Sequence, residues 1–175
     1  MLHHAAWKKA ALHVAHKRPF CNFIPSLAMP GFLPGIVFLS SSFIIIMTTE
    51  ERINNSETRI FKAVFPNTTN HYDTLFGGTA MHLMDEVAFI TATRFARKRM
   101  VTVSSDKIDF KKPIPAGTII ELIGRVTHVG NTSLKVLVEI YIEEMYSFER
   151  HKAITGTFTF VAINQEKQPI SVEGE

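Results

Sequence analysis

The spacing of apolar residues predicts one long helix near the middle of the chain. From residue 76 to about residue 97 there is no proline, and apolar side chains recur at helical spacing. They form two stripes on nearly opposite sides of the predicted helix. One stripe consists of Met81, Met84, Ala88, Ala92 and Phe95, and the other of Leu83, Val87 and Ile90. A helix that is apolar on two sides is expected to be buried on two sides.

Strand-like runs flank the predicted helix. A short β-prone run (RIFKAVF, residues 59–65) precedes it and ends at Pro66. Four longer runs follow it, at residues 100–110, 118–129, 132–144 and 151–163. In the third of these, apolar and mostly polar positions alternate, which is typical of a half-buried strand. One strand, a long helix and then four strands indicate an α+β fold, in which an antiparallel sheet curls around the helix.

The N-terminal stretch differs from the rest of the chain. Residues 19–49 carry no charge, but prolines and glycines interrupt the apolar run, and no A-x-A-like cleavage site follows it. Three interpretations stay open: a start codon assigned too early, with Met47 as the real start; a targeting segment; or a membrane anchor. We therefore expect an N-terminal extension over residues 1–52, the folded domain over residues 53–165 and a polar C-terminal tail over residues 166–175.

Charge and cysteine content narrow the possible functions. The sequence pI of 9.1 comes from Lys8, Lys9, Lys17 and Arg18, because from Met47 onward 15 basic residues face 16 acidic ones. A nearly neutral domain gives no reason to expect nucleic-acid binding. A single cysteine, Cys21, excludes a disulfide framework and a thiolate metal site within one chain. We expect a cytoplasmic protein whose domain does not bind membranes, although the N-terminal extension leaves its location open.

Four motifs occur in order along the domain. They are N-x-x-x-x-x-F-G-G from Asn70, MDE from Met84, VTVSSDKIDFKKPIPAG from Val101 and GNTS from Gly130. Together they resemble the acyl-CoA hydrolase group of hotdog thioesterases, which includes the YciA-type enzymes and the cytosolic acyl-CoA thioester hydrolases. The resemblance covers roughly residues 53–165. One departure is Asp73, where that group more often has glycine, but aspartate tolerates left-handed backbone angles and the loop can still form.

The resemblance implies a fold, a reaction and an assembly. The fold would be the hotdog fold, an antiparallel sheet wrapped around one long helix. The reaction would convert acyl-CoA to free CoA and a carboxylic acid, with no cofactor and no metal. The assembly would be a homodimer or a trimer of dimers with shared active sites. We expect the second protomer to cover the stripe of Leu83, Val87 and Ile90. The rivals are an acyl-ACP hydrolase or dehydratase on the same fold, and a non-catalytic acyl-CoA sensor.

The candidate catalytic residues lie around the start of the helix. Gly77 and Gly78 would let a thioester carbonyl approach the first N–H groups, which lack intrahelical partners and favour negative charge. Asp85 lies seven residues after Gly78, on the same face but about 10 Å along the axis. It would act as general base or as nucleophile through an anhydride. The resemblance places an asparagine opposite the acid, and Asn70 occupies that position. The alternatives are a buried structural acceptor for Asp85 and a loop cap for Asn70.

The remaining site residues concern CoA and the acyl chain. The resemblance places Gly130, Asn131, Thr132 and Ser133 against CoA, and the alternative is an ordinary hairpin turn. Lys111, Lys112, Arg150 and Lys152 are candidate partners for the CoA phosphates, or solvated surface cations. Met81, Met84 and Phe89 are candidates to close the acyl tunnel. The sequence contains no G-x-S-x-G motif, which disfavours a serine hydrolase. His71 and His82 flank the glycine pair without a second acid or histidine at ligand spacing, which disfavours a metal site there.

Overall fold

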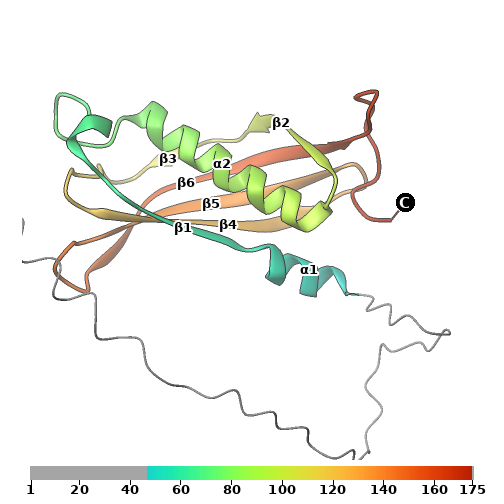
Figure 1. The fold of residues 1–175 in the computed structure, drawn as a ribbon, viewed down its shortest axis with the longest axis horizontal. Coiled ribbons are helices and arrows are strands. Elements are labelled where there is room, and N and C mark those ends of the chain that lie inside the picture. Colours follow the sequence, from blue (N-terminus) through green and yellow to red (C-terminus); the bar gives the residue numbers. More distant parts are fainter. Residues whose placement is uncertain (1–46, 175) are drawn as a thin grey trace, which may run out of the picture. The chain divides into compact units, whose positions relative to one another are not determined.

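A six-stranded antiparallel sheet curls around one long helix, α2 (Gly77–Ala96) (Figure 1). The computed structural model describes residues 47–174, and the predictions for residues 1–46 lie outside the described residues. The strand order is β1 (Thr58–Ala63), β4 (Ile119–Val129), β5 (Ser133–Glu143), β6 (Arg150–Ile163), β2 (Arg99–Ser105). A short strand, β3 (Asp109–Phe110), also pairs with β6. The predicted α+β hotdog arrangement is confirmed.

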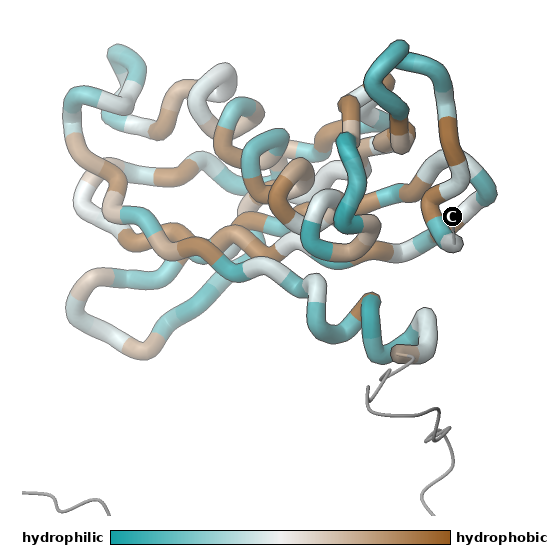
Figure 2. Tube along the Cα trace, turned by 45° about the vertical axis from the view of Figure 1, so that its right-hand side comes forward, coloured by the Kyte–Doolittle hydropathy of each residue, from teal (hydrophilic) through white to brown (hydrophobic). Residues whose placement is uncertain are grey.

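Apolar and polar residues alternate along the strands, and the apolar ones form the core on the face of the sheet that α2 covers. The predicted inward positions of β5 are buried, and the helix residues Met84, Ala88 and Ala92 are fully buried opposite the sheet. Hydrophobic positions gather where the helix and the sheet face each other, while α1 (Thr49–Ser56) is mostly hydrophilic (Figure 2). At Gly124 a Cβ would lie 2.9 Å from Val87 Cγ1, so a side chain there would push α2 off the sheet. The buried, inward-facing positions of β5 are Leu134, Val136, Val138, Ile140 and Ile142.

One expectation about the helix is wrong. Leu83 and Val87 are only 8% and 1% exposed within a single protomer, and Ile90 is half-buried, so this stripe needs little cover from a second chain. The reason is the curl of the sheet, which brings β1, β2, β4, β5 and β6 all into contact with α2. The uncovered apolar side chains on the helix are instead Met81 and Phe89, which are 44% and 46% exposed. Among residues 47–174, the helix face left open is therefore the face that carries Met81 and Phe89.

The helix α1 was not predicted, because the segment is short and polar. It begins after Thr48, whose side chain accepts a hydrogen bond from Glu51 N at 3.2 Å while Glu51 Oε2 accepts one from Thr48 N at 2.8 Å. This reciprocal pair is a capping box, and the sequence T-x-x-E at residues 48–51 was its signal. Arg52 then donates to Phe95 O at 2.9 Å, which ties α1 to the last turns of α2.

The segment expected as a polar C-terminal tail packs back onto the domain. Val172 is only 1% exposed and donates its N–H to Asn131 O at 2.7 Å. Lys98 Nζ donates to Ser171 O at 2.9 Å, and Glu173 lies 3.4 Å from Arg52 of α1. These contacts link the segment to three other parts of the domain. Within residues 47–174, no helix has the length and hydropathy needed to cross a membrane.

Removal of residues 1–46 is expected to leave a folded domain, since the capping box of α1 is complete from Thr48 onward. We expect the thermal unfolding midpoint of the truncated protein to lie within a few degrees of that of the full chain. Circular dichroism melts of both proteins measure this. If the truncated protein aggregates or unfolds while the full chain stays folded, residues 1–46 contribute to the domain and the proposed boundary fails.

Candidate active site

The carboxylate of Asp85 meets the edge strand β2. Asp85 lies in the third turn of α2, and the hydroxyl of Thr102 donates to its Oδ1 at 3.0 Å. The pairing of β2 with β6 shifts register between Thr102 and Ser104, which leaves Val103 as an extra residue in a β-bulge. Bulges redirect side chains and are frequent beside active sites. The bulge and the helix together place a hydroxyl donor against a carboxylate.

Asp85 is exposed within one protomer, whereas the sequence placed it among apolar residues of a helix buried on two sides. It opens into a hollow of about 400 Å³ between α2 and β2. The physical reason is the strand order: β2 is an edge of the sheet, so no other strand among residues 47–174 covers the outer side of the α2–β2 gap. The hollow is lined by Met81, His82, Asp85, Thr102, Val103, Ser104, Ser105 and Phe158.

The glycines predicted to form the oxyanion site lie at the N-terminus of α2, and their role stays a prediction. Gly77 is the first helical residue, and the first intrahelical hydrogen bond runs from Ala80 N to Phe76 O at 3.0 Å. Among residues 47–174, the N–H groups of Gly77 and Gly78 have no backbone or side-chain acceptor. A Cβ on Gly78 would lie 3.0 Å from the ring of Phe76, so a larger residue would crowd this site. These N–H groups are free to bind a developing negative charge.

Asn70 caps its own loop, which was the local alternative for this residue. Its Oδ1 accepts hydrogen bonds from Tyr72 N at 2.9 Å, Thr74 N at 3.3 Å and Thr74 Oγ1 at 3.1 Å. Asp73 adopts the left-handed conformation expected of it, with φ of 56°. Within the part of the chain that the structure describes, the side-chain NH₂ of Asn70 has no acceptor. The amide is thus held by its oxygen and keeps two N–H donors for another molecule.

One chain does not bring the predicted catalytic residues together. Asn70 lies in the loop before α2, Gly77 and Gly78 lie at the helix start, and Asp85 lies about 10 Å further along the axis. Asp85 contacts β2, whereas Phe110, next to β6, is the side chain nearest to a Cβ on Gly77, at 3.8 Å. The acid and the oxyanion donors of one protomer are therefore too far apart to act on the same carbonyl group.

The GNTS segment forms the connection between β4 and β5. Gly130 N donates to Ser133 O at 2.8 Å, which is the hairpin contact predicted from local turn chemistry. The carbonyl groups of Asn131 and Thr132 accept from Val172 N and Ala162 N at 2.7 and 3.0 Å. Since Ser133 pairs with Val161, this turn lies where β6 ends, beside the start of β2 and the C-terminal end of α2.

The four basic residues predicted to contact the CoA phosphates divide into two pairs. Arg150 Nε donates to Glu121 at 3.0 Å, and Lys152 is hydrogen-bonded to Glu139. Both glutamates are buried, 3% and 8% exposed, so these cations neutralise carboxylates that would otherwise be costly. The hydrogen bond to Glu139 raises the pKa of Lys152. The other pair, Lys111 and Lys112, is exposed and follows β3, near the start of α2. Their role in CoA binding stays a prediction.

Sequence reasoning missed Thr102 and a group of three cations. Thr102 was unremarkable in a strand-like run, and only the packing of α2 on β2 shows that it faces Asp85. Arg97, Lys98 and Arg99 follow the end of α2 directly, and they line a second hollow between α2 and β2. Among the described residues, no group of three or more histidine, cysteine, aspartate or glutamate side chains is placed to hold a metal ion.

Comparisons with known proteins agree on one family. The model of the thioesterase superfamily matches residues 72–148. An uncharacterized acyl-CoA thioester hydrolase of Bacillus subtilis, YkhA, is 39% identical over 128 residues, which cover 72% of this chain and 74% of that protein. The acyl-CoA hydrolase of Staphylococcus aureus, solved in complex with butyryl-CoA, CoA and CoA disulfide, is 38% identical with a TM-score of 0.67, covering 70% and 74% of the two chains. A hexameric acyl-CoA thioesterase is 35% identical with a TM-score of 0.66, covering 68% and 76%.

Structures of the Staphylococcus aureus enzyme have also been solved for variants at three of its residues. An asparagine, an aspartate 15 residues later (43 − 28) and a threonine 17 residues after that (60 − 43) have each been replaced by alanine in solved structures. The same spacings separate Asn70, Asp85 and Thr102 in this chain.

Proposed function

This chain belongs to the acyl-CoA thioester hydrolase family of the thioesterase superfamily, and on that premise we propose that it hydrolyses acyl-CoA to free CoA and a carboxylic acid. The observation that carries the proposal is the contact between Asp85 and Thr102 in an open hollow. A sensor that only binds acyl-CoA needs no exposed carboxylate held by a hydroxyl donor, whereas hydrolysis needs a group that activates water or attacks the thioester.

The chemistry assigned to the site has two routes. As general base, Asp85 takes a proton from water while the oxygen adds to the thioester carbon, and the C–S bond then breaks to release the CoA thiol. As nucleophile, its carboxylate oxygen attacks the same carbon and expels the thiolate, and water hydrolyses the resulting anhydride. Both routes place negative charge on the carbonyl oxygen. The N–H groups of Gly77 and Gly78, with the amide of Asn70, are donors for that charge.

The active site is proposed to be shared between two protomers. The acid of one chain lies too far from its own oxyanion donors, so the donors come from the partner. The open face around Asp85 is also apolar: Met81, Phe89, Val101 and Val103 are 38% to 55% exposed, beside the edge of β2 that pairs with no other described strand. Pairing that edge with its copy would cover these side chains. A homodimer, or a trimer of such dimers, is the expected assembly, and the domain is expected to act in the cytoplasm.

Thiol release separates this proposal from its rivals on the same fold. Purified protein would be mixed with acyl-CoA, the matching acyl-ACP and the matching enoyl-CoA, and free thiol would be followed with a thiol reagent. We expect thiol release from acyl-CoA above all, and a series from acetyl-CoA to palmitoyl-CoA would give the preferred chain length. Faster release from acyl-ACP, or hydration of the enoyl thioester without thiol release, would reassign the reaction.

Thr102 is proposed as a positioning residue for Asp85. Replacing Thr102 with valine keeps the shape and removes the hydroxyl, so the carboxylate loses the donor that fixes its orientation. We expect kcat to fall about 10- to 100-fold with KM nearly unchanged, the range for a hydrogen bond to a charged group. Thr102→Ser keeps the hydroxyl and should retain most of the activity. Equal losses in both variants would show that packing at this position matters, and not the hydroxyl.

A further inference from the structure

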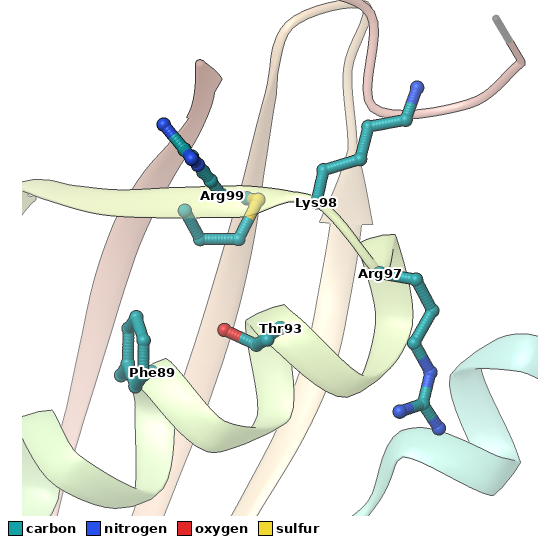
Figure 3. A pocket seen from close by; sticks show the side chains of 6 residues that line it. Phe89, Thr93, Arg97, Lys98 and Arg99 are labelled. Carbon is teal, nitrogen blue, oxygen red and sulfur yellow. The ribbon is translucent and has the colours of Figure 1, made fainter. Parts of the chain in front are cut away.

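His82 lines the same hollow between α2 and β2 as Asp85. It precedes Asp85 by three residues on the helix, so the two Cβ atoms lie about 5–6 Å apart on one face. The other residues that line this hollow are apolar or carry a hydroxyl group. The second hollow, between the last turns of α2 and the start of β2, is lined by three cations and by no carboxylate or imidazole (Figure 3). Of these two hollows, only the one at Asp85 therefore combines an acid with an imidazole.

The imidazole of His82 is not used by the fold. The side chain is exposed within one protomer, and within residues 47–174 it makes no side-chain hydrogen bond and no ion pair. Histidine is a weaker helix former than alanine, leucine or lysine, so the helix gains nothing from it. Both ring nitrogens are therefore available to a bound molecule.

The proposed shared site places His82 between the two reaction centres of a dimer. If Asp85 of each chain meets Gly78 of the other, two-fold symmetry puts the axis midway between residues 78 and 85, beside residues 81 and 82. His82 then lies about 4.5 Å along the helix from Asp85, on the side of the axis. Exposure within a single protomer is what a residue of such a shared site should show.

Departure of the CoA sulfur needs a proton that none of the residues assigned so far supplies. Asp85 takes a proton from water or attacks the thioester, and the N–H groups of Gly77 and Gly78 stabilise the carbonyl oxygen. Neither group donates to sulfur. Because an alkyl thiol has a pKa of about 8.5, its thiolate can leave unaided, but a positioned acid speeds the step.

We propose that His82 is the general acid that protonates the departing sulfur of the substrate. This rests on the proposed function, which places the thioester at Asp85. When the C–S bond breaks, its electron pair stays on sulfur and the proton of the His82 imidazolium moves to it, which gives the free thiol. Asp85 then passes the proton that it took from water to His82 through solvent, which restores both groups. In the nucleophile route, the neutral imidazole instead accepts a proton from the water that hydrolyses the anhydride.

An imidazolium at this position has no like charge beside it in the hollow. The charged neighbours of His82 on α2 are Asp85 and Glu86, three and four residues further along the helix, and both are acids. The strand β2 faces the hollow with the hydroxyl groups of Thr102, Ser104 and Ser105 and contributes no charge. The acid and the base of the proposed reaction are therefore separate groups on one helix face.

The test is His82→Gln in the full-length protein, because glutamine keeps a polar side chain but carries no acidic proton. For acyl-CoA we expect kcat to fall about 10- to 100-fold with KM nearly unchanged. With the same acyl group on an aromatic thiol, the loss should be under about threefold, because an aromatic thiolate leaves without a proton. The molar mass from light scattering and the unfolding midpoint should match the wild type. Equal losses on both thioesters, or no loss on acyl-CoA, would overturn the proposal.

The pH profile is a second readout, which a purely structural role would not move. Wild-type kcat for acyl-CoA should fall on the alkaline side, since histidine loses its proton between about pH 5 and 8 and the donor is then gone. His82→Gln should lack this alkaline fall. His82→Lys should restore much of kcat and move the fall upward, because lysine keeps its proton to about pH 10. An alkaline fall that is unchanged in His82→Gln would belong to another group and overturn the proposal.

His151→Gln is the matched control, and it separates the loss of one imidazole from the loss of any imidazole. It removes an exposed histidine at the start of β6 and should change neither kcat nor the pH profile. Failure of the function has its own signature: a wild type that releases no thiol from any acyl-CoA removes the hydrolase assignment and the general acid together. Equal thiol release by wild type and His82→Gln, with Asp85→Asn inactive, removes His82 alone.

Discussion

Replacing Asp85 with asparagine is expected to lower kcat by ~10²–10⁴ while the protein stays folded, in the range for loss of a general base. Asparagine has the size of aspartate and can still accept the hydrogen bond from Thr102 Oγ1, so the local packing survives. What it lacks is the negative charge that takes a proton from water or attacks the thioester. Because Asp85 is exposed and away from the core, the unfolding midpoint should barely change.

The measurement is steady-state thiol release by wild type and variant, with circular dichroism melts of both. Glu86→Gln is the matched control: it removes the neighbouring exposed carboxylate, about 100° around the helix from Asp85, and should leave kcat nearly unchanged. Near-wild-type turnover by a folded Asp85→Asn protein would remove Asp85 from the chemistry. A loss of the same size in the Glu86 variant would mean that general charge around the site matters, and not one acid.

The second large effect is recovery of activity when two inactive chains are combined. Asp85→Asn and Asn70→Ala chains should each have little activity alone. If each site takes Asp85 from one chain and Asn70 from the other, a mixed dimer holds one site with both lesions and one intact site. We expect about half of the wild-type activity per mixed dimer, since one of its two sites is whole.

The mixed dimers would be produced by co-expression with two different affinity tags and isolated by two successive purifications. Mass spectrometry then confirms that both chains are present. Dimers that carry Asp85→Asn on both differently tagged chains are the control for contaminating activity. If the site lay within one chain, every site of a mixed dimer would carry one lesion and activity would stay at the level of the single variants. That result would refute the shared site and leave the hydrolase assignment untouched.

The central architecture was predictable because its signals are long and periodic. The helix expected from residue 76 to 97 is observed as Gly77–Ala96, and three of the four later strands agree with the predicted runs within about two residues. The run at residues 100–110 instead divides into β2 and β3. Between them the chain leaves the ladder, and Asp106 N donates to Thr157 O at 2.8 Å. Alternation of residue types did not reveal that interruption.

Short or non-local features were harder to predict. The helix α1 has too few apolar residues for a periodic signal, and its capping box is a purely local cue. The C-terminal segment packs on the core through Val172 and the partly buried Ile170, and two apolar residues in a polar stretch give no periodic signal. The exposure of Asp85 depends on β2 being an edge strand, which is a property of strand order. Thr102 and Asp85 are 17 residues apart, and only the packing of a helix on a strand joins them.

The most direct test of the central claim is release of CoA thiol by the purified protein at substrate excess, with and without Asp85. The account predicts many turnovers per active site for at least one acyl-CoA between acetyl and palmitoyl, and almost none for Asp85→Asn under the same conditions. Tight, stoichiometric binding of acyl-CoA without thiol release by the wild type would contradict it, because the protein would then bind the thioester as a sensor and not hydrolyse it.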